Sequence, residues 1–209
     1  MDSQLWDDLK VGAETIGRLR RLATLVDKWT RIINLVAKST RPDIWDRHIE
    51  DSARLLLFAP DQVKCWADFG SGGGFPGLVI AIILHDRNCV VSLVESDQRK
   101  AAFLREAARQ IGVQVDIHMQ RAEALAPLGP DVISARALAP LAGLCSIVAR
   151  HAAPETISLF PKGGQWQAEV AEARKDWVFD LEVHPDPRHK EAVILELRNL
   201  RRVEPGINN

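Results

Sequence analysis

One glycine-rich stretch of the chain has the residue types and spacing of a nucleotide-cofactor loop. It reads Asp68-Phe69-Gly70-Ser71-Gly72-Gly73-Gly74-Phe75-Pro76-Gly77 and precedes the apolar run 78–84. Glycines allow positive φ angles and let a backbone approach a ligand without a Cβ in the way. Pro76 suits the first turn of a helix, and the free amides there favour an anionic or carboxylate-bearing ligand. The stretch therefore predicts a cofactor loop between a buried strand and a helix.

The acids around this loop indicate which cofactor it holds. Gly72, Gly74 and Gly77 fit the dinucleotide spacing G-x-G-x-x-G, which is a weak signal by itself. Glu95 ends the next predicted strand, where an acid binds ribose hydroxyls of either cofactor. Asp68 can accept a hydrogen bond from the ammonium group of S-adenosylmethionine, whereas its charge would be unfavourable beside a pyrophosphate. The residues favour S-adenosylmethionine over a dinucleotide.

Further polar residues follow the later predicted strands. Ala122 and Glu123 follow the third strand, where the Ala122 N–H and the Glu123 side chain can meet an adenine. Arg136 follows the fourth strand and Lys162 the fifth. Ligands of open α/β sheets bind at the carboxyl ends of the strands, so these cations should converge beside the methyl donor. Their desolvation is costly unless an electron-rich acceptor uses them; the alternative is a salt bridge with a local acid.

The motifs that the chain lacks restrict the methyl acceptor. No Asn/Asp-Pro-Pro-aromatic tetrad, as used for exocyclic amino groups, follows the fourth strand, and no Pro-Cys nucleophile exists for cytosine C5 chemistry. Cys65, Cys89 and Cys145 show no metal-ligand spacing, and we expect no metal. A ring nitrogen with an in-plane lone pair fits these absences because it has no proton to remove. Catalysis then consists of positioning and electrostatics.

The rest of the sequence predicts the elements that position these residues. Three helices precede Pro60: a short one capped by Ser3, a longer one from about Ala13 that is broken at 40–43, and a third from Asp43 to about Phe58. Beyond them strands and helices alternate as in a doubly wound sheet, and the last two strands form an antiparallel pair at its edge. The predicted strands span about 64–69, 90–95, 114–118, 131–135, 155–160, 177–184 and 191–197, and the helices about 76–84, 97–111, 139–151 and 165–174.

Length and charge limit the class of protein. The 209 residues allow one α/β domain at 60–209 with an N-terminal helical extension at 1–59. The longest apolar run is far too short to span a membrane, and acids near the start argue against a targeting peptide. We therefore expect a cytoplasmic protein without a membrane partner. Net charge is −1, but basic residues exceed acids by five between Arg18 and Arg47, which indicates either a phosphate-facing surface or a solvated helix face.

Taken in order, these landmarks resemble the bacterial small-subunit ribosomal RNA guanine-N7 methyltransferases, the RsmG or glucose-inhibited division protein B family. The resemblance covers nearly the whole chain. It rests on Asn34-Leu35, the stretch 47–52, the loop 68–77, Val94-Glu95-Ser96, Lys100-x-x-Phe103-Leu104, and the stretches 121–123, 135–137 and 162–163. It implies a Rossmann-like class I S-adenosylmethionine-dependent methyltransferase fold, with a mostly parallel seven-stranded sheet, an antiparallel C-terminal strand pair and an N-terminal helical extension.

The resemblance also implies a set of functional residues and a substrate. S-adenosylmethionine would be held by Asp68, Gly70, Gly72, Gly74, Phe75, Glu95, Ala122, Glu123 and Arg136. The acceptor would be N7 of one guanine in 16S rRNA of the small ribosomal subunit, oriented by Arg136 and Lys162 as the catalytic residues. Asn34, Arg47, His48 and Lys162 would contact the RNA, although His48 lies beside an apolar stripe and has a packing role as its alternative.

Two other functions are compatible with the fold. An NAD-dependent oxidoreductase is disfavoured by Asp68 and by the absence of any tyrosine that could serve as its catalytic residue. A non-catalytic rRNA-binding assembly factor is disfavoured by the intact acids Asp68, Glu95 and Glu123. We expect the active protein to be a monomer.

Overall fold

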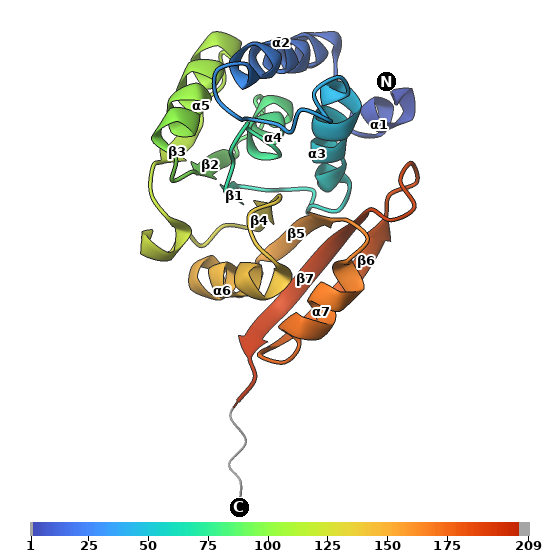
Figure 1. The fold of residues 1–209 in the computed structure, drawn as a ribbon, viewed down its shortest axis with the longest axis vertical. Coiled ribbons are helices and arrows are strands. Elements are labelled where there is room, and N and C mark those ends of the chain that lie inside the picture. The colour runs from blue at the N-terminus through green and yellow to red at the C-terminus, as the bar shows by residue number, and fades with distance from the viewer. Residues whose placement is uncertain (1, 205–209) are drawn as a thin grey trace, which may run out of the picture.

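The computed structural model describes residues 2–204 and shows one mixed sheet with helices packed on both faces (Figure 1). Its strand order is β3-β2-β1-β4-β5-β7-β6. The first five strands of that order pair in parallel, whereas β7 is antiparallel to both β5 and β6. The strands are β1 (Cys65–Phe69), β2 (Val90–Val94), β3 (Asp116–His118), β4 (Val132–Ala135), β5 (Ile157–Lys162), β6 (Trp177–Pro185) and β7 (Val193–Arg202). The predicted seven-stranded sheet with an antiparallel C-terminal pair is confirmed.

The helices that follow the sheet strands lie close to their predicted positions. They are α4 (Gly77–Ile83), α5 (Gln98–Ile111), the short 3-10 turn η3 (Ala122–Ala124), α6 (Leu141–His151) and α7 (Trp166–Ala173). Asp97 caps α5 by accepting hydrogen bonds from the N–H groups of Arg99 and Lys100, and Gly112 ends it in the left-handed conformation. In Figure 1 α4 and α5 lie on one side of the sheet and α6 and α7 on the other.

Alternation along β1 divides the core into two layers. Successive strand side chains point to opposite faces of a sheet, and Trp66 and Phe69 are both fully buried on different faces. Trp66 belongs to the apolar cluster that includes Leu22 of α2 and Phe103 of α5, whereas Phe69 packs with the cluster that includes Leu144 of α6. Because both faces of β1 are buried, every residue of the strand except Asp68 is apolar.

The N-terminal helices depart most from the prediction. They are α1 (Ser3–Asp8), α2 (Ala13–Thr30), the π-helical turn η1 (Trp45–Glu50), α3 (Asp51–Ala53) and the 3-10 turn η2 (Arg54–Leu57). Asp2 rather than Ser3 caps α1, through its carboxylate and the Leu5 N–H. The third helical stretch starts directly after Asp43, as predicted: Ile44 is helical, and the Asp43 carbonyl oxygen accepts from the Arg47 N–H at 2.8 Å.

The second helix ends at Thr30, well before the predicted break at 40–43. Ile33 and Val36, which continue its apolar spacing, are buried, but they belong to the turn segment 31–44 that connects α2 to η1. This segment runs over the glycine loop. If Gly73 carried a Cβ, that atom would lie 3.1 Å from the Leu35 carbonyl oxygen. Packing against the loop therefore stabilises the turns in place of further helix.

The N-terminal helices share a core with the sheet. Leu19 and Leu22 of α2 lie in the same buried cluster as Leu78 and Ile80 of α4. Because residues of 1–59 and of 60–209 belong to the same buried apolar cluster, the domain boundary between them stays a prediction. Within residues 2–204, every helix is too short or too polar to cross a lipid bilayer.

Candidate active site

The glycine loop is shaped by positive φ angles and by its contact with β2. Gly70, Gly72 and Gly74 have φ angles of 70°, 53° and 87°, in the left-handed region that glycine adopts without a steric penalty. The Gly70 N–H donates to the carbonyl oxygen of Val94 at 2.8 Å. A Cβ on Gly77 would collide with the Leu93 side chain of β2. The loop is therefore held against the end of β2.

Asp68 lies beneath this loop rather than on its surface. The side chain is fully buried; its Oδ1 accepts from the Ser134 hydroxyl at 2.8 Å and its Oδ2 from the Gly77 N–H at 3.1 Å. Ser134 in turn accepts from Trp66 Nε1 at 2.8 Å. Burial raises the pKa of Asp68 to about 6 despite these hydrogen bonds. In this structure Asp68 fixes the loop, and its contact with a donor ammonium stays a prediction.

A first hollow, here called the strand-end cleft, opens where β1, β2, β3 and β4 end. It has a volume of about 450 Å³. Of the predicted donor-binding residues, it brings together Gly70, Glu95, Ala122 and Glu123. Glu95 is fixed in the wall because its two carboxylate oxygens accept from the N–H groups of Asp97, at 2.7 Å, and Gly72, at 2.9 Å.

The other predicted donor-binding residues lie outside the lining of this cleft. Gly72 and Gly74 form the turns of the loop with positive φ angles, and Phe75 is buried under Arg136. Lys100 and Leu138 also line the cleft. Lys100 belongs to a motif that carries the family resemblance, but no ligand contact was predicted for it or for Leu138. The place of Lys100 in the first turn of α5, directly after the end of β2, is the signal that could have indicated one.

A second hollow, the connecting groove, lies beside the first and has a volume of about 580 Å³. Both are lined by Ala137, Leu138 and Ala139, the segment that follows β4. A Cβ added to Gly70 would lie only 2.7 Å from Leu138 Cδ1. The partly exposed Leu138 side chain therefore packs directly on the glycine loop, and it lines both hollows. Arg136 and Lys162 both line the connecting groove, and their convergence beside a methyl donor stays a prediction.

A third hollow, the hairpin pocket, lies between η1 and the turn that joins β6 to β7. Its volume is about 310 Å³. Arg136, Pro161, Lys162 and Gly163 line both this pocket and the connecting groove. Each hollow therefore shares lining residues with the next, and the two cations line both the connecting groove and the hairpin pocket.

Arg136 is held in place by residues of η1. Its Nη1 donates to the Arg47 carbonyl oxygen at 3.0 Å, and its Nη2 donates to His48 Nδ1. The guanidinium also lies over the Phe75 ring, 5.5 Å from the centroid. Burial lowers the pKa of Arg136, against the attraction of Asp51 and Asp68. The side chain is thus a fixed, partly desolvated cation, the kind of group that attracts an electron-rich ligand.

His48 supports Arg136 from behind. Only 6% of the residue is exposed; the ring stacks on Phe75 at 5.0 Å, and its Nε2 lies 2.9 Å from Thr40 Oγ1. Burial, with the neighbouring charges of Arg136 and Arg47, lowers the pKa of His48 to about 3, so the ring is neutral and can accept from Arg136. The structure favours the packing alternative for this residue, and its contact with RNA stays a prediction.

Lys162 ends β5 in an ion pair with a local acid, the alternative that the sequence left open. Its Nζ lies 2.7 Å from Glu169 Oε2 and donates to the Ala139 carbonyl oxygen at 3.2 Å. Glu169, in the first turn of α7, also accepts from the Leu141 N–H at 2.8 Å. Glu169 was missed because its proximity to Lys162 depends on how α7 folds back over the strand end.

The remaining predicted RNA contacts lie on the surface near η1. Arg47 is exposed and its Nη1 lies 3.2 Å from His189 Nε2 of the β6–β7 turn. Asn34 is exposed in the segment 31–44. Part of the basic excess of this region is neutralised locally, since Asp27 pairs with both Arg31 and Arg41.

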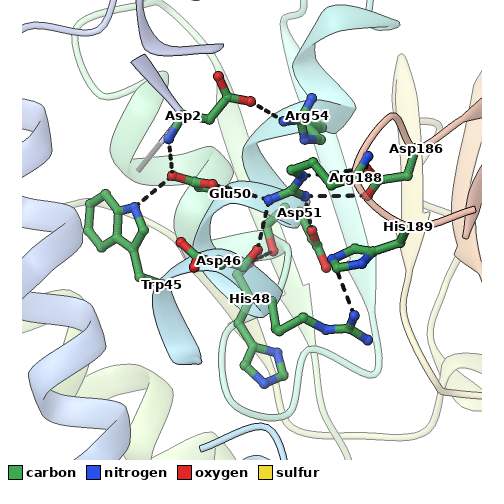
Figure 2. A network of polar contacts seen from close by, with 12 residues as sticks. Asp2, Trp45, Asp46, His48, Glu50, Asp51, Arg54, Asp186, Arg188 and His189 are labelled. Carbon is green, nitrogen blue, oxygen red and sulfur yellow. Dashed lines mark hydrogen bonds and ion pairs between the residues drawn. The ribbon is translucent and has the colours of Figure 1, made fainter. Parts of the chain in front are cut away.

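A network centred on Arg188 joins the two walls of the hairpin pocket (Figure 2). From the β6–β7 turn, Arg188 donates to the Asp46 carbonyl oxygen, to Glu50 at 3.1 Å, to Asp51 and to Asp186. Sequence reasoning missed this network because Arg188 and its partners in η1 and α3 are separated by well over one hundred residues. It fixes η1, and hence the groups that hold Arg136, relative to the hairpin.

Comparisons with known proteins bear on the whole chain. A family profile described as rRNA small subunit methyltransferase G matches residues 15–194. The chain is 47% identical to the ribosomal RNA small subunit methyltransferase G of Cereibacter sphaeroides (strain ATCC 17025 / ATH 2.4.3), over 97% of this chain and 98% of that protein. It is 46% identical to the protein of the same name from Parvibaculum lavamentivorans, over 96% of this chain and 90% of that one.

Solved structures of other proteins share the fold at low sequence identity. The ribosomal protein L11 methylase of Lactobacillus delbrueckii subsp. bulgaricus superposes with a TM-score of 0.58 at 16% identity, over 76% of this chain and 79% of that one. A point mutant of MtNAS, in complex with S-adenosylmethionine, superposes with a TM-score of 0.56 at 16% identity, over 87% of this chain and 71% of that one. The predicted class I methyltransferase fold is confirmed.

Proposed function

The chain belongs to the rRNA small subunit methyltransferase G family, and we propose that it transfers the methyl group of S-adenosylmethionine to N7 of one guanine in 16S rRNA. The observation that supports this proposal is that Ala137–Ala139 line both the strand-end cleft and the connecting groove, and that Arg136 and Lys162 line the connecting groove.

The strand-end cleft fits the chemistry of the donor. Glu95 and Glu123 offer carboxylates for hydroxyl and amino groups, and Gly70 presents bare backbone at the floor. The volume of about 450 Å³ is of the size that accepts a nucleoside-sized ligand. When bound, S-adenosylmethionine supplies an electrophilic methyl group on a positively charged sulfur. We assign Glu95 to the ribose, Ala122 and Glu123 to the adenine, and the loop from Asp68 to Phe75 to the methionine end.

The residues beside the cleft suit an acceptor that needs no general base. N7 of guanine carries a lone pair and no proton, so the protein has only to position the base. Arg136 and Lys162 would donate to guanine O6 and to the RNA phosphates. Methylation leaves a positive charge on the purine, and Glu169 beside Lys162, with Asp51 in the hairpin pocket, supplies negative charge close to it.

The RNA would approach over the N-terminal part of the chain. Arg47 and Asn34 are exposed next to the connecting groove and the glycine loop, respectively, and we assign both to the RNA face of the 1–59 extension. His48 contributes to this face through Arg136. The partner is 16S rRNA or the small ribosomal subunit, and the protein acts as a cytoplasmic monomer without a membrane partner.

A titration and a transfer assay test the proposal. Isothermal calorimetry with S-adenosylmethionine and with NAD separates a methyltransferase from the oxidoreductase alternative. Transfer of a tritiated methyl group to small subunits from a strain that lacks the modification separates an enzyme from a non-catalytic assembly factor. Donor binding with label in 16S rRNA supports the proposal; binding of NAD alone, or RNA binding without label, contradicts it.

A further inference from the structure

His151 is a buried imidazole outside the residues assigned above. It is the last residue of α6 and is fully buried. Its Nε2 lies 2.9 Å from the Ala122 carbonyl oxygen, which requires the tautomer that carries its proton on Nε2. The Nδ1 atom has no hydrogen-bond partner within residues 2–204. A buried polar atom left unpaired is costly, so the position is unusual for a residue that only fills space.

The ring contacts two of the segments that form the strand-end cleft. It packs against Phe69, with centroids 4.6 Å apart and planes tilted by 48°, and Phe69 is the residue directly before Gly70. Its hydrogen bond is to Ala122 at the start of η3, a residue that lines the cleft. One side chain therefore joins the base of the glycine loop to the turn that we assign to the adenine.

Charge and burial keep this imidazole neutral. Burial lowers the pKa of His151, and Arg150 adds to that effect, whereas the Ala122 carbonyl and Glu123 oppose it; His118 also lies near. A neutral ring donates one hydrogen bond, and the Ala122 carbonyl oxygen receives it. The Ala122 carbonyl oxygen thereby has two donors, since it also accepts from the Leu125 N–H at 3.3 Å. The preceding peptide unit, which carries the Ala122 N–H, is held through the Arg121 carbonyl oxygen, which accepts from the Ala124 and Leu125 N–H groups at 3.0 and 3.2 Å. His151 therefore anchors the short turn to which the Ala122 N–H belongs.

We propose that His151 is a positioning residue for the donor, which sets the backbone of Ala122 so that this residue recognises an adenine and rejects a hypoxanthine in the strand-end cleft. The inference rests on the proposed function, because it takes this cleft as the adenosine site. An adenine presents a lone pair at N1, to which the Ala122 N–H donates, whereas a hypoxanthine presents an N1–H at the same place. Two facing N–H groups cannot form a hydrogen bond, so the analogue is rejected.

Calorimetric titrations with S-adenosylhomocysteine and S-inosylhomocysteine test this inference. The His151→Leu variant removes the donor to Ala122, and His151→Gln replaces it with an amide that reaches the same oxygen. We expect the leucine variant to bind S-adenosylhomocysteine about tenfold more weakly, the size of one lost hydrogen bond, and S-inosylhomocysteine almost unchanged. The glutamine variant should recover most of the preference for adenine. His85→Leu, the same substitution outside the cleft, is the matched control and should bind as wild type.

The ratio of the two affinities distinguishes positioning from a merely structural role. If His151→Leu weakens both ligands equally, or leaves both unchanged, the inference is wrong. If the leucine variant does not fold, as judged by circular dichroism, His151→Asn takes its place, because its shorter amide does not reach Ala122; it should show the same reduced ratio, and a wild-type ratio would overturn the inference. Failure of the wild-type protein to bind S-adenosylhomocysteine at all would instead contradict the proposed function.

Discussion

Replacing Arg136 by lysine keeps the positive charge beside the strand-end cleft but removes the fixed orientation of the guanidinium N–H donors. In the wild-type protein the guanidinium donates to the Arg47 carbonyl oxygen at 3.0 Å and to His48 Nδ1, and it lies over Phe75. A lysine ammonium is a point charge on a flexible stem and cannot reproduce this planar arrangement. The variant therefore tests whether the orientation of Arg136 matters for turnover.

The expected size of the effect follows from the bonds that are lost. A hydrogen bond from a charged donor contributes about 1.5–3 kcal/mol, and Arg136→Lys loses at least one of the two bonds that η1 accepts from it. If that free energy is lost from the oriented acceptor complex, kcat falls about 10- to 100-fold. Donor affinity should stay within about threefold of wild type, since the lysine keeps the positive charge next to the cleft, whose lining does not include Arg136.

The assay measures methyl transfer from tritiated S-adenosylmethionine to unmodified small subunits at saturating donor, with donor affinity measured separately by calorimetry. Arg198→Lys is the matched control, because Arg198 on β7 pairs with Glu196 and has a half-exposed side chain; it should retain wild-type turnover. A wild-type kcat for Arg136→Lys, or a loss of donor affinity as large as the loss of kcat, would refute the orienting role.

Four further changes test other parts of the site. Lys162→Ala should lower turnover by about two orders of magnitude in the transfer assay. Calorimetry should show that it weakens donor binding less than Arg136→Ala does. A Lys162→Ala variant that turns over at the wild-type rate would show that Lys162 has no role in catalysis. Gly72→Asp should fold at a modest cost, because the nearest atom to its Cβ is the Gly70 carbonyl oxygen at 3.6 Å and aspartate is among the residues that best tolerate the positive φ of this position. It should still abolish donor binding by calorimetry, because it adds a carboxylate beside Glu95. Unchanged affinity would contradict the role of the loop. Gly77→Ala would place a Cβ 2.7 Å from Asp68 Oδ2 and should lower the free energy of unfolding by about 1–3 kcal/mol, seen as a lower urea midpoint; an unchanged midpoint would show that the loop can shift. Burial gives His48 a pKa of about 3 in the folded state, against an ordinary value of 6.5, so the unfolded state binds the extra proton and stability falls as the pH is lowered through 6.5. Relative to His48→Phe, the wild-type protein should lose about 2 kcal/mol of unfolding free energy between roughly pH 8 and pH 5, measured by urea denaturation. The same difference in unfolding free energy between the two proteins at both pH values would show that the ring is not buried as described.

The comparison with His48→Phe matters because Asp68 titrates in the opposite sense. Burial raises the pKa of Asp68 to about 6 from its ordinary value of 3.8, so the folded state binds the extra proton between these values. The stability that this group contributes is present below pH 3.8 and is lost as the pH rises through about 6. The wild-type pH profile therefore contains both slopes, and only the difference between variants isolates His48.

Sequence patterns predicted most of the sheet because its signals are local. The strand that carries Asp68, the glycines with positive φ and the run of buried residues in α4 each follow from residue type and spacing. The convergence of Arg136 and Lys162 could also be predicted, since parallel strands bring their carboxyl ends to one edge. These inferences needed no knowledge of side-chain packing.

The features that sequence reasoning missed depend on contacts between distant segments. The partners of Arg188 lie in η1 and α3, and the hydrogen bond from His151 to Ala122 crosses from α6 to η3. The register of β1 with β4 pairs Asp68 with Ser134, whose hydroxyl donates to the Asp68 carboxylate, and this internal hydrogen bond could not be predicted from the local pattern. Apolar spacing continued past Thr30, but packing of segment 31–44 on the glycine loop ended α2 there. Such contacts are fixed by tertiary structure rather than by local pattern.

Mapping the transferred methyl group tests the central claim most directly. Small subunits from a strain that lacks the modification are incubated with the protein and deuterated S-adenosylmethionine, and their 16S rRNA is digested and analysed by mass spectrometry and by cleavage chemistry specific for N7-methylguanine. The label should appear on N7 of one guanine and should be lost in Arg136→Ala. Label on another atom, on many guanines, or nowhere in 16S rRNA while the donor still binds would contradict the account.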